Sequence, residues 1–163
     1  MSEKNLSEDL KKGMRNLASG VCVITSVGED GERVAMTASS VTSVSDNPAS
    51  LLVCINKSAK LDTILQTQTN FTVNVLNNDQ QDVSNTCAKP AEGESRFEIG
   101  NWTKDEGTGL PYLSDALSVF FCEKSKVIEY GTHNIYIGNI QTVNYSEDTQ
   151  DILVYAKGGY HKI

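Results

Sequence analysis

Short runs of β-branched and apolar residues, separated by turn signals, dominate this sequence and most constrain its fold. Val21 to Val27 is one such run, and the turn signal Gly28-Glu29-Asp30-Gly31 leads from it to a second run at Arg33 to Ala38. Two strand-like runs joined by a short turn predict a β-hairpin. Many strands with short turns and few helices between them indicate a closed or nearly closed antiparallel barrel.

The remaining runs extend this pattern along the chain. Ser50 to Ile55 is apolar without alternation, which predicts a strand buried on both faces. Ala88 to Pro111 is rich in Gly, Glu, Pro, Lys and Thr, and is expected to form a long surface excursion. Further strands are expected at Val41 to Val44, Phe71 to Leu76, Ala116 to Tyr130, Asn134 to Tyr145 and Asp151 to Tyr155, before a tail at Gly158 to His161.

Helices are expected to be few and short. An apolar stripe predicts an amphipathic helix within residues 1–18 that packs on the barrel, with Ser7 as its cap. A second short helix is expected at Lys60 to Thr67, and Asp79 to Cys87 is expected to be helical or irregular. The stripe of the first helix consists of Leu6, Leu10, Met14 and Leu17.

Length and charge limit the classes of function. A chain of 163 residues, 39% of them apolar, can bury the core of a single domain that spans residues 1–163. The formal net charge of -7 would repel nucleic acid. The sequence contains no run of about 18 apolar residues, so no membrane span is predicted. The polar N-terminus lacks the apolar segment of a secretory signal, so a cytoplasmic protein is expected.

The four cysteines, Cys22, Cys54, Cys87 and Cys122, lie far apart and form no C-x-x-C pair. Three of them fall within apolar runs, where a free thiol behaves as a small hydrophobe. They are therefore interpreted as reduced core thiols rather than as redox or metal-binding residues, and no metal site is predicted.

Two polar segments are candidate binding sites. Thr37-Ala38-Ser39-Ser40 ends a predicted strand, where small hydroxyl residues leave room for a flat ring and can donate hydrogen bonds. The alternative is a strand with one face in water. Asn56-Lys57-Ser58-Ala59-Lys60 begins the second helix, and two lysines there suit a phosphate group. The alternative is that Ser58 only caps the helix.

His133, in Gly131-Thr132-His133, lies in a turn that joins two long strands. It is either a surface residue or a contact to a nicotinamide or flavin edge. Ser-His-Asp, paired-acid and H-E-x-x-H patterns are absent from the sequence, so hydrolysis is unsupported. A reaction carried by a cofactor needs few protein groups and fits such a sequence.

Taken in order, these residues resemble the flavin reductase-like family, whose members include the small reductase components of two-component flavin monooxygenases. The similarity extends from about Met14 to Ile163. The matching motifs are Met14 to Val21, Met36 to Ser40, Thr42 to Ser45, Pro48, Leu52 to Asn56, Phe71 to Leu76, Arg96-Phe97, Gly131 to His133 and Gly158 to His161. Departures from the family pattern lie at Ala35, Ala49 and Gly159.

This resemblance implies a mostly β split barrel, that is, a Greek-key antiparallel barrel with a few short flanking helices. It implies a homodimer that transfers hydride from NADH or NADPH to FMN or FAD and supplies reduced flavin to a partner monooxygenase. The alternative is a non-catalytic flavin-binding electron carrier on the same fold. Neither the choice of flavin nor that of nicotinamide follows from the sequence.

The resemblance also assigns roles to residues. Thr37, Ala38, Ser39 and Ser40 would line the isoalloxazine ring. Cys54, Asn56, Lys57, Ser58 and Lys60 would flank the ribityl and phosphate groups, and Arg96 would reach a phosphate. His133 and Tyr160 would lie on the nicotinamide or adenine side, where His133 is expected to orient the rings rather than to transfer a proton.

Overall fold

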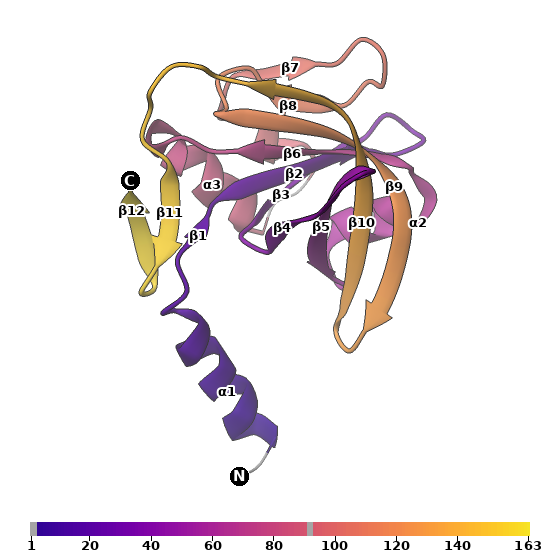
Figure 1. Ribbon diagram of the computed structural model, residues 1–163. Coiled ribbons are helices and arrows are strands. Elements are labelled where there is room, and N and C mark those ends of the chain that lie inside the picture. Colours follow the sequence, from indigo (N-terminus) through magenta and orange to yellow (C-terminus); the bar gives the residue numbers. More distant parts are fainter. Residues whose placement is uncertain (1–2, 91–92) are drawn as a thin grey trace.

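The computed structural model describes residues 3–90 and 93–163 and consists mainly of strands (Figure 1). In this part of the chain, no helix is long and apolar enough to cross a membrane. The helices are α1 (Glu3–Met14), α2 (Lys60–Thr67), α3 (Gln81–Ala88), and the 3-10 helices η1 (Asn78–Gln80) and η2 (Ser95–Phe97). The strands are β1 (Ser19–Gly20), β2 (Cys22–Val27), β3 (Arg33–Ala38), β4 (Val41–Asp46), β5 (Ala49–Asn56), β6 (Asn70–Val75), β7 (Trp102–Lys104), β8 (Pro111–Leu113), β9 (Ser118–Tyr130), β10 (His133–Tyr145), β11 (Leu153–Ala156) and β12 (Gly159–Lys162).

Seven strands form one antiparallel sheet in the order β3-β2-β6-β9-β10-β5-β4. A three-stranded sheet, β1-β11-β12, and a two-stranded sheet, β7-β8, lie beside it. The edge strands β3 and β4 are consecutive in the chain, yet no pairing joins them in the described residues. The large sheet is therefore open along this seam, which fits a split barrel. The predicted mostly β fold with a few short helices is confirmed.

The largest core cluster lies between the curved sheet and α2. Leu61 and Leu65 of α2 are almost completely buried, together with Phe71 on β6. Gly138 on β10 permits close approach of the strands, because a Cβ added there would lie 2.5 Å from the Phe71 ring. The β9–β10 register shifts beside this glycine. The core thus fixes α2, and with it the segment that precedes the helix, against the sheet.

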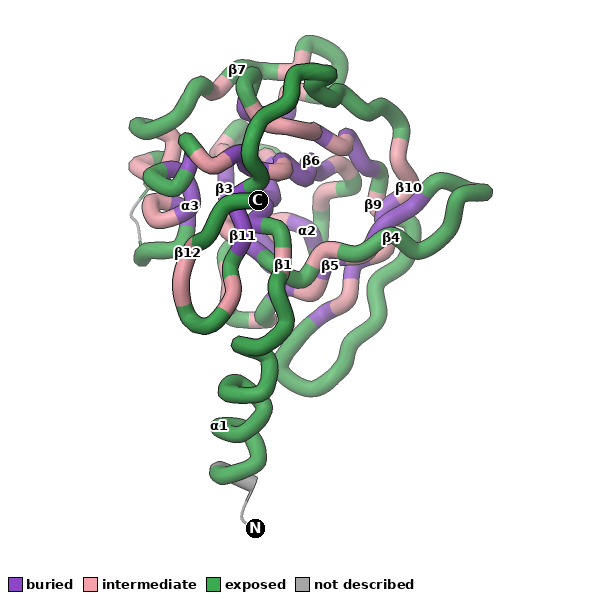
Figure 2. Tube along the Cα trace, turned by 60° about the vertical axis from the view of Figure 1, so that its left-hand side comes forward, coloured by how far each residue is buried: buried purple, intermediate pink, exposed green. Residues whose placement is uncertain are grey.

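Helix α1 exists as predicted, but its environment differs from the expectation. Ser7 lies inside the helix, which begins at Glu3, so Ser7 is not its cap. The apolar stripe of α1 is exposed to solvent, with Leu6 62% and Leu10 63% accessible. The helix projects from the rest of the protein, and Figure 2 shows it exposed from Asn5 to Met14. The packing of this helix on the barrel, expected from its amphipathic pattern, is therefore not found within this chain.

Other predicted elements agree closely with the structure. The β2–β3 hairpin pairs Cys22 with Ala38 and Val27 with Arg33, and α2 occupies the predicted residues. Ser58 does not cap α2, because Ala59 holds the N-cap position and makes no side-chain cap bond. The expected tail at Gly158 to His161 instead contributes β12, which pairs with β11.

The cysteines are free thiols, as predicted. Cys22, Cys87 and Cys122 are buried, and Cys54 on β5 is half-buried. Burial raises the thiol pKa of Cys22 and of Cys122 to about 12. Since the thiolate is the reactive form, these groups are inert near neutral pH.

Candidate functional site

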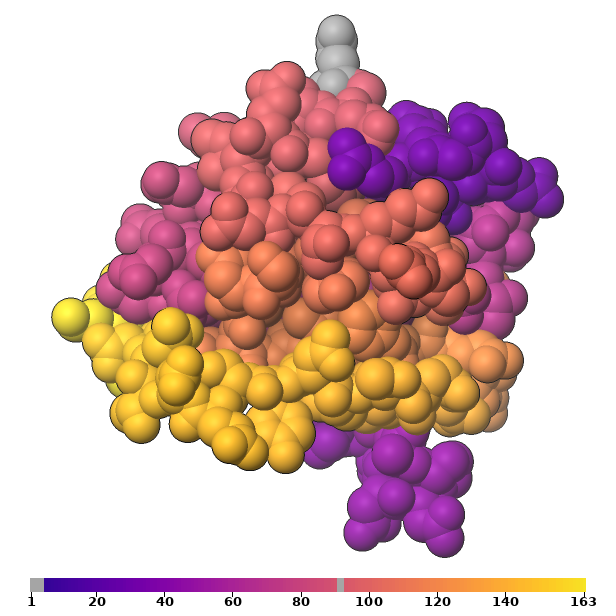
Figure 3. Space-filling view, turned by 90° about the horizontal axis from the view of Figure 1, so that it is seen from above, coloured from indigo at the N-terminus to yellow at the C-terminus, as the bar shows by residue number. Residues whose placement is uncertain are grey.

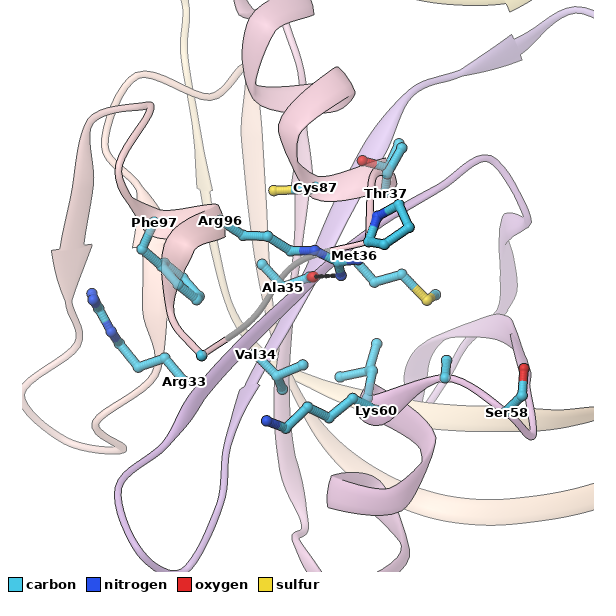
Figure 4. Close-up of a pocket in the computed structure, with 15 residues that line it drawn as sticks. Arg33, Val34, Ala35, Met36, Thr37, Ser58, Lys60, Cys87, Arg96 and Phe97 are labelled. Carbon is cyan, nitrogen blue, oxygen red and sulfur yellow. Dashed lines mark hydrogen bonds between the residues drawn. The ribbon is translucent and has the colours of Figure 1, made fainter.

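A cavity of about 450 Å³ lies between β3, the segment before α2, and the loop that follows α3 (Figure 4). We call it the cationic cavity, because three basic side chains line it. Its walls are formed by Arg33, Val34, Ala35, Met36, Thr37, Ser58, Ala59, Lys60, Leu61, Cys87, Ala88, Pro90, Gly93, Arg96 and Phe97. A cavity of this size can hold a nucleotide-sized group.

Two of the three cations are already paired with carboxylates. The Arg33 Nε donates to Glu94 at 2.7 Å, and its guanidinium lies 4.3 Å from the centre of the Phe97 ring. Lys60 forms an ion pair with Glu32 of the β2–β3 turn. Both pairs are partly exposed, so each is weak and an anionic ligand can replace the carboxylate at low cost.

The third cation, Arg96, is held by backbone carbonyls. Its two terminal nitrogens donate to the Ala35 carbonyl at 2.6 Å and to the Lys89 carbonyl at 2.7 Å. Its Nε is buried and has no hydrogen-bond partner among the described residues. A buried donor without an acceptor is costly. The two carbonyl bonds hold the guanidinium in the wall of the cavity, where its positive charge attracts an anionic ligand.

A buried carboxylate anchors the first turn of α2 next to this cavity. Asp62 is 4% exposed and accepts hydrogen bonds from the Tyr136 hydroxyl at 2.5 Å and the Asn134 amide at 2.9 Å. Burial, and then the hydrogen bond to Asp62, raise the pKa of Tyr136. These bonds tie α2 to β10, so that the segment carrying Ser58 and Lys60 is fixed relative to the sheet.

A second cavity, of about 270 Å³, adjoins the first and shares Thr37 and Ala88 with it. We call it the aromatic cavity. Tyr155 and Tyr160 pack edge to face there, with ring centres 5.4 Å apart. Its other walls are Val21, Ala38, Ser39 and Ser84.

Hydroxyl groups connect the walls of the aromatic cavity. The Thr37 hydroxyl donates to the Ser84 carbonyl at 2.6 Å, and the Ser84 hydroxyl lies 2.7 Å from the Tyr160 hydroxyl. These bonds fix β3, α3 and β12 relative to one another. The space between them is bordered by small and flat side chains, and it suits a planar ring.

A third group of predicted residues lies at the junction of β5 and the β9–β10 turn. His133 is paired with Asn56 in the sheet register, and its Nδ1 lies 2.8 Å from the Thr132 hydroxyl. The Lys57 ammonium contacts Glu129 at 2.6 Å, and this hydrogen bond lowers the pKa of Glu129. The Asn56 side chain accepts from both the backbone N–H and the hydroxyl of Ser58. We call this group the histidine corner.

The predicted site residues are thus distributed over neighbouring regions rather than gathered in one cavity. Ser40 lies apart, and its hydroxyl donates to the Cys54 carbonyl at 3.0 Å. The cationic cavity contains Thr37, Ser58, Lys60 and Arg96, and the aromatic cavity contains Thr37, Ala38, Ser39 and Tyr160. Asn56, Lys57 and His133 of the histidine corner border neither cavity, and Ser58 connects this corner to the cationic cavity.

Several residues that border these cavities were not predicted from the sequence. Arg33, Ala35 and Thr37 alternate along β3, so their side chains lie on the same face of the strand. This alternation was the signal that could have placed Arg33 beside Thr37. Tyr155 and Ser84 had no such signal, because the packing of β11, β12 and α3 brings them to the cavity.

The arrangement fits a phosphate-bearing planar cofactor and offers little acid–base chemistry. Cys87, in the wall of the cationic cavity, has a pKa raised to about 11, because burial outweighs the opposing effect of Arg96. Its thiol is therefore neutral in the physiological range. The cavities offer cations, hydroxyl donors and aromatic surface, which bind and orient a ligand whose own chemistry carries the reaction.

Comparisons with known proteins agree with this geometry. The reductase component of FADH(2)-dependent resorcinol hydroxylase from Rhizobium sp. (strain MTP-10005) is 33% identical over 94% of this chain and 86% of its own length. The FMN reductase (NADH) RutF of Stutzerimonas stutzeri (strain A1501) is 36% identical over 96% of this chain and 88% of its own.

A solved structure shows the same fold. BorF, the flavin reductase component of a bacterial two-component tryptophan halogenase, superposes with a TM-score of 0.87 at 34% identity. The match covers 96% of this chain and 98% of BorF. The family model for the flavin reductase-like domain matches residues 14–163. This chain therefore belongs to the flavin reductase-like domain family.

Proposed function

We propose that this protein is an NAD(P)H-dependent flavin reductase, an oxidoreductase that transfers hydride from a reduced nicotinamide to FMN or FAD. The observation that supports this most directly is the pair of adjoining cavities that share Thr37. One presents cations to a phosphate, and the other presents aromatic and hydroxyl groups to a planar ring. Both relatives described above are named as reductases, one of them with FMN and NADH.

The residues of the chain would bind and orient the reactants. Lys60 and the Arg96 guanidinium would hold a phosphate, since both residues line the cationic cavity. Thr37, whose hydroxyl donates to Ser84, would border the ring, and the Ser39 hydroxyl would be a donor for the negative charge that develops on reduction. When bound, the flavin supplies the hydride acceptor. The chain contributes alignment, which is the main requirement of such a transfer.

His133 would act by orientation from the histidine corner. Its Nδ1 is engaged by the Thr132 hydroxyl, and the ring lies next to Asn56 at the end of β5. The imidazole is exposed, and it borders neither cavity of the single chain. This placement suits a residue that contacts the edge of a bound ring from outside, rather than one enclosed with the reacting atoms.

The assembly proposed is a cytoplasmic homodimer that delivers reduced flavin to a flavin-dependent monooxygenase. The exposed apolar stripe of α1 supports a second copy, because soluble proteins rarely leave such faces uncovered. Free cysteines support a reducing compartment. The resorcinol hydroxylase relative is itself a reductase component.

Steady-state oxidation of NADH and NADPH, each with FMN, FAD or riboflavin in excess, tests the proposal. We expect the free flavin to be turned over many times per protein molecule, with a measurable preference for one nicotinamide. A flavin that is bound tightly but not turned over would instead identify an electron carrier. If the protein neither binds flavin nor accelerates NADH oxidation, the proposal is wrong.

A further inference from the structure

Beyond Arg33, the surface contains another cavity, which we call the outer cavity. Its volume is about 460 Å³, nearly equal to that of the cationic cavity. It is bordered by the β2–β3 turn and by the β7–β8 pair, with Trp102, Lys104 and Pro111 among its walls. Figure 3 shows the β2–β3 turn lying against the segment that carries these strands. None of the roles assigned so far uses this space.

Arg33 borders both the cationic cavity and the outer cavity. Its guanidinium lies over the Phe97 ring at 4.3 Å, and this ring packs edge to face against Trp102 with centres 4.7 Å apart. A continuous Arg33–Phe97–Trp102 wall therefore leads from one cavity to the other. An anionic group bound to Arg33 would lie between the cationic cavity and the outer cavity.

The outer cavity has the chemistry of a nucleotide subsite. The half-buried Trp102 indole is fixed because its Nε1 donates to the Ile99 carbonyl at 2.9 Å. Pro111 and Val27 add apolar surface beside it. Lys104 is exposed and takes part in none of the ion pairs found among the described residues. An aromatic face beside an unengaged cation suits a purine ring that carries a phosphate.

We propose that the outer cavity binds the adenosine-phosphate half of a dinucleotide whose other half extends into the cationic cavity. The pyrophosphate that joins the two halves would then lie near Arg33, where it would compete with Glu94 for the guanidinium. The inference rests on the proposed function only for the ligand's other half. FAD and the reduced nicotinamide dinucleotide both carry this adenosine phosphate, so the test must tell them apart.

The single tryptophan of the chain reports directly on this cavity. We expect AMP to change the Trp102 emission in a saturable way, and ribose 5-phosphate, which lacks the purine, to change it much less. The titration should extend to about 10 mM, because nucleotide fragments bind weakly. The proposal is overturned if AMP leaves the emission unchanged over this range. This readout needs no enzyme activity, so it stays informative even if the protein reduces no flavin.

The variant Lys104→Gln identifies the dinucleotide, with Lys126→Gln on the exposed part of β9 as its matched control. A partly exposed charge contact changes affinity by up to about five-fold. If FAD is the occupant, Lys104→Gln raises the ratio of the KM values for FAD and FMN by this factor. If the nicotinamide dinucleotide is the occupant, the ratio of the KM values for NADH and for reduced nicotinamide mononucleotide rises instead. If Lys104→Gln, like the control, shifts neither ratio, the assignment of Lys104 and of the subsite is refuted.

Discussion

The cationic cavity and the aromatic cavity share Thr37 and Ala88, but they would bind a ligand by different interactions. Around the first, Arg33 and Lys60 are paired with carboxylates, so a phosphate must exchange places with Glu94 or Glu32. In the second, neutral hydroxyls and tyrosine rings border the space. Affinity in the first should depend on charge and salt, whereas affinity in the second should depend on shape and packing.

This difference explains how an acidic protein can bind an anionic cofactor. The net charge is -7, and the carboxylates nearest the cations offset part of the local positive field. Arg96 differs from the other two cations because backbone carbonyls hold it, and none of the ion pairs among the described residues includes it. Among the three cations, Arg96 should therefore contribute most to binding.

The substitution Arg96→Met should have the largest effect. It removes a guanidinium that forms no ion pair among the described residues, and hydrogen bonds to charged groups are worth enough to change affinity by about 10- to 100-fold. We expect the dissociation constant for FMN, measured by flavin fluorescence, to rise by this factor. The constant for riboflavin, which lacks the phosphate, should rise far less.

The exposed Arg15, outside both cavities, provides the control variant Arg15→Met. Thermal unfolding of both variants shows whether the loss of the bonds to Ala35 and Lys89 also destabilises the fold. A folded Arg96→Met protein that binds FMN as tightly as the unmodified protein would contradict the role assigned to this residue.

Tyr160→Phe tests the aromatic cavity with a smaller expected effect. It removes the hydrogen bond to the Ser84 hydroxyl, and a neutral bond of this kind contributes about 1 kcal/mol to the free energy of unfolding. Urea denaturation measures this loss. Tyr155→Phe is the matched control, since the Tyr155 hydroxyl makes no hydrogen bond within residues 3–90 and 93–163. Equal stability losses in the two variants would rule out a specific contribution of the Ser84 bond.

The two cavities also differ in how far the sequence predicts them. Strand β3 and helix α2 follow from apolar periodicity, because hydrophobic burial determines both. Thr37, Ser39 and Lys60 could be identified since they lie at the ends of these elements. The aromatic cavity needs β12, and the Gly158-Gly159 pair at the start of this strand resembles a turn. Only the pairing with β11 makes this segment a strand and brings Tyr160 to Ser84.

Local competition between hydrogen bonds explains why Ser58 does not cap α2. Ser58 is a good helix cap by type, yet the Asn56 side chain accepts from its backbone N–H at 2.9 Å and from its hydroxyl at 2.8 Å. The cap position falls instead to Ala59. Which of two short-range bonds forms depends on the geometry at the end of β5. No sequence pattern specifies that geometry.

Ionic strength separates the two kinds of binding without any substitution. Raising the salt concentration from about 0.05 M to about 0.5 M shortens the screening length to about 4 Å, so partly exposed charge contacts weaken. The dissociation constant for FMN should rise about three-fold, while that for riboflavin should stay nearly constant. A common salt dependence for both flavins would show that the cationic cavity does not hold the phosphate.

The smallest expected effect concerns Cys87, which borders the cationic cavity. Its pKa of about 11 in the folded protein exceeds the value of 9.0 for a free thiol. Folding therefore favours the neutral thiol. The contribution of Cys87 to the free energy of unfolding is fully present below pH 9 and is lost as the pH rises toward 11. At pH 9.5 the loss should be less than about 1 kcal/mol.

Urea denaturation at pH 7.5 and at pH 9.5 measures this contribution. The difference in unfolding free energy between the unmodified protein and Cys87→Ala should shrink at the higher pH. Cys54→Ala, which removes a half-buried thiol on β5, is the control. Because Arg96 lowers the pKa of Cys87, Arg96→Met should raise this pKa further, so that the loss still begins near pH 9 but continues to a higher pH. If the loss of stability ends at the same pH in that variant, the guanidinium charge is not felt inside the cavity, and the contrast with the aromatic cavity then rests on shape alone.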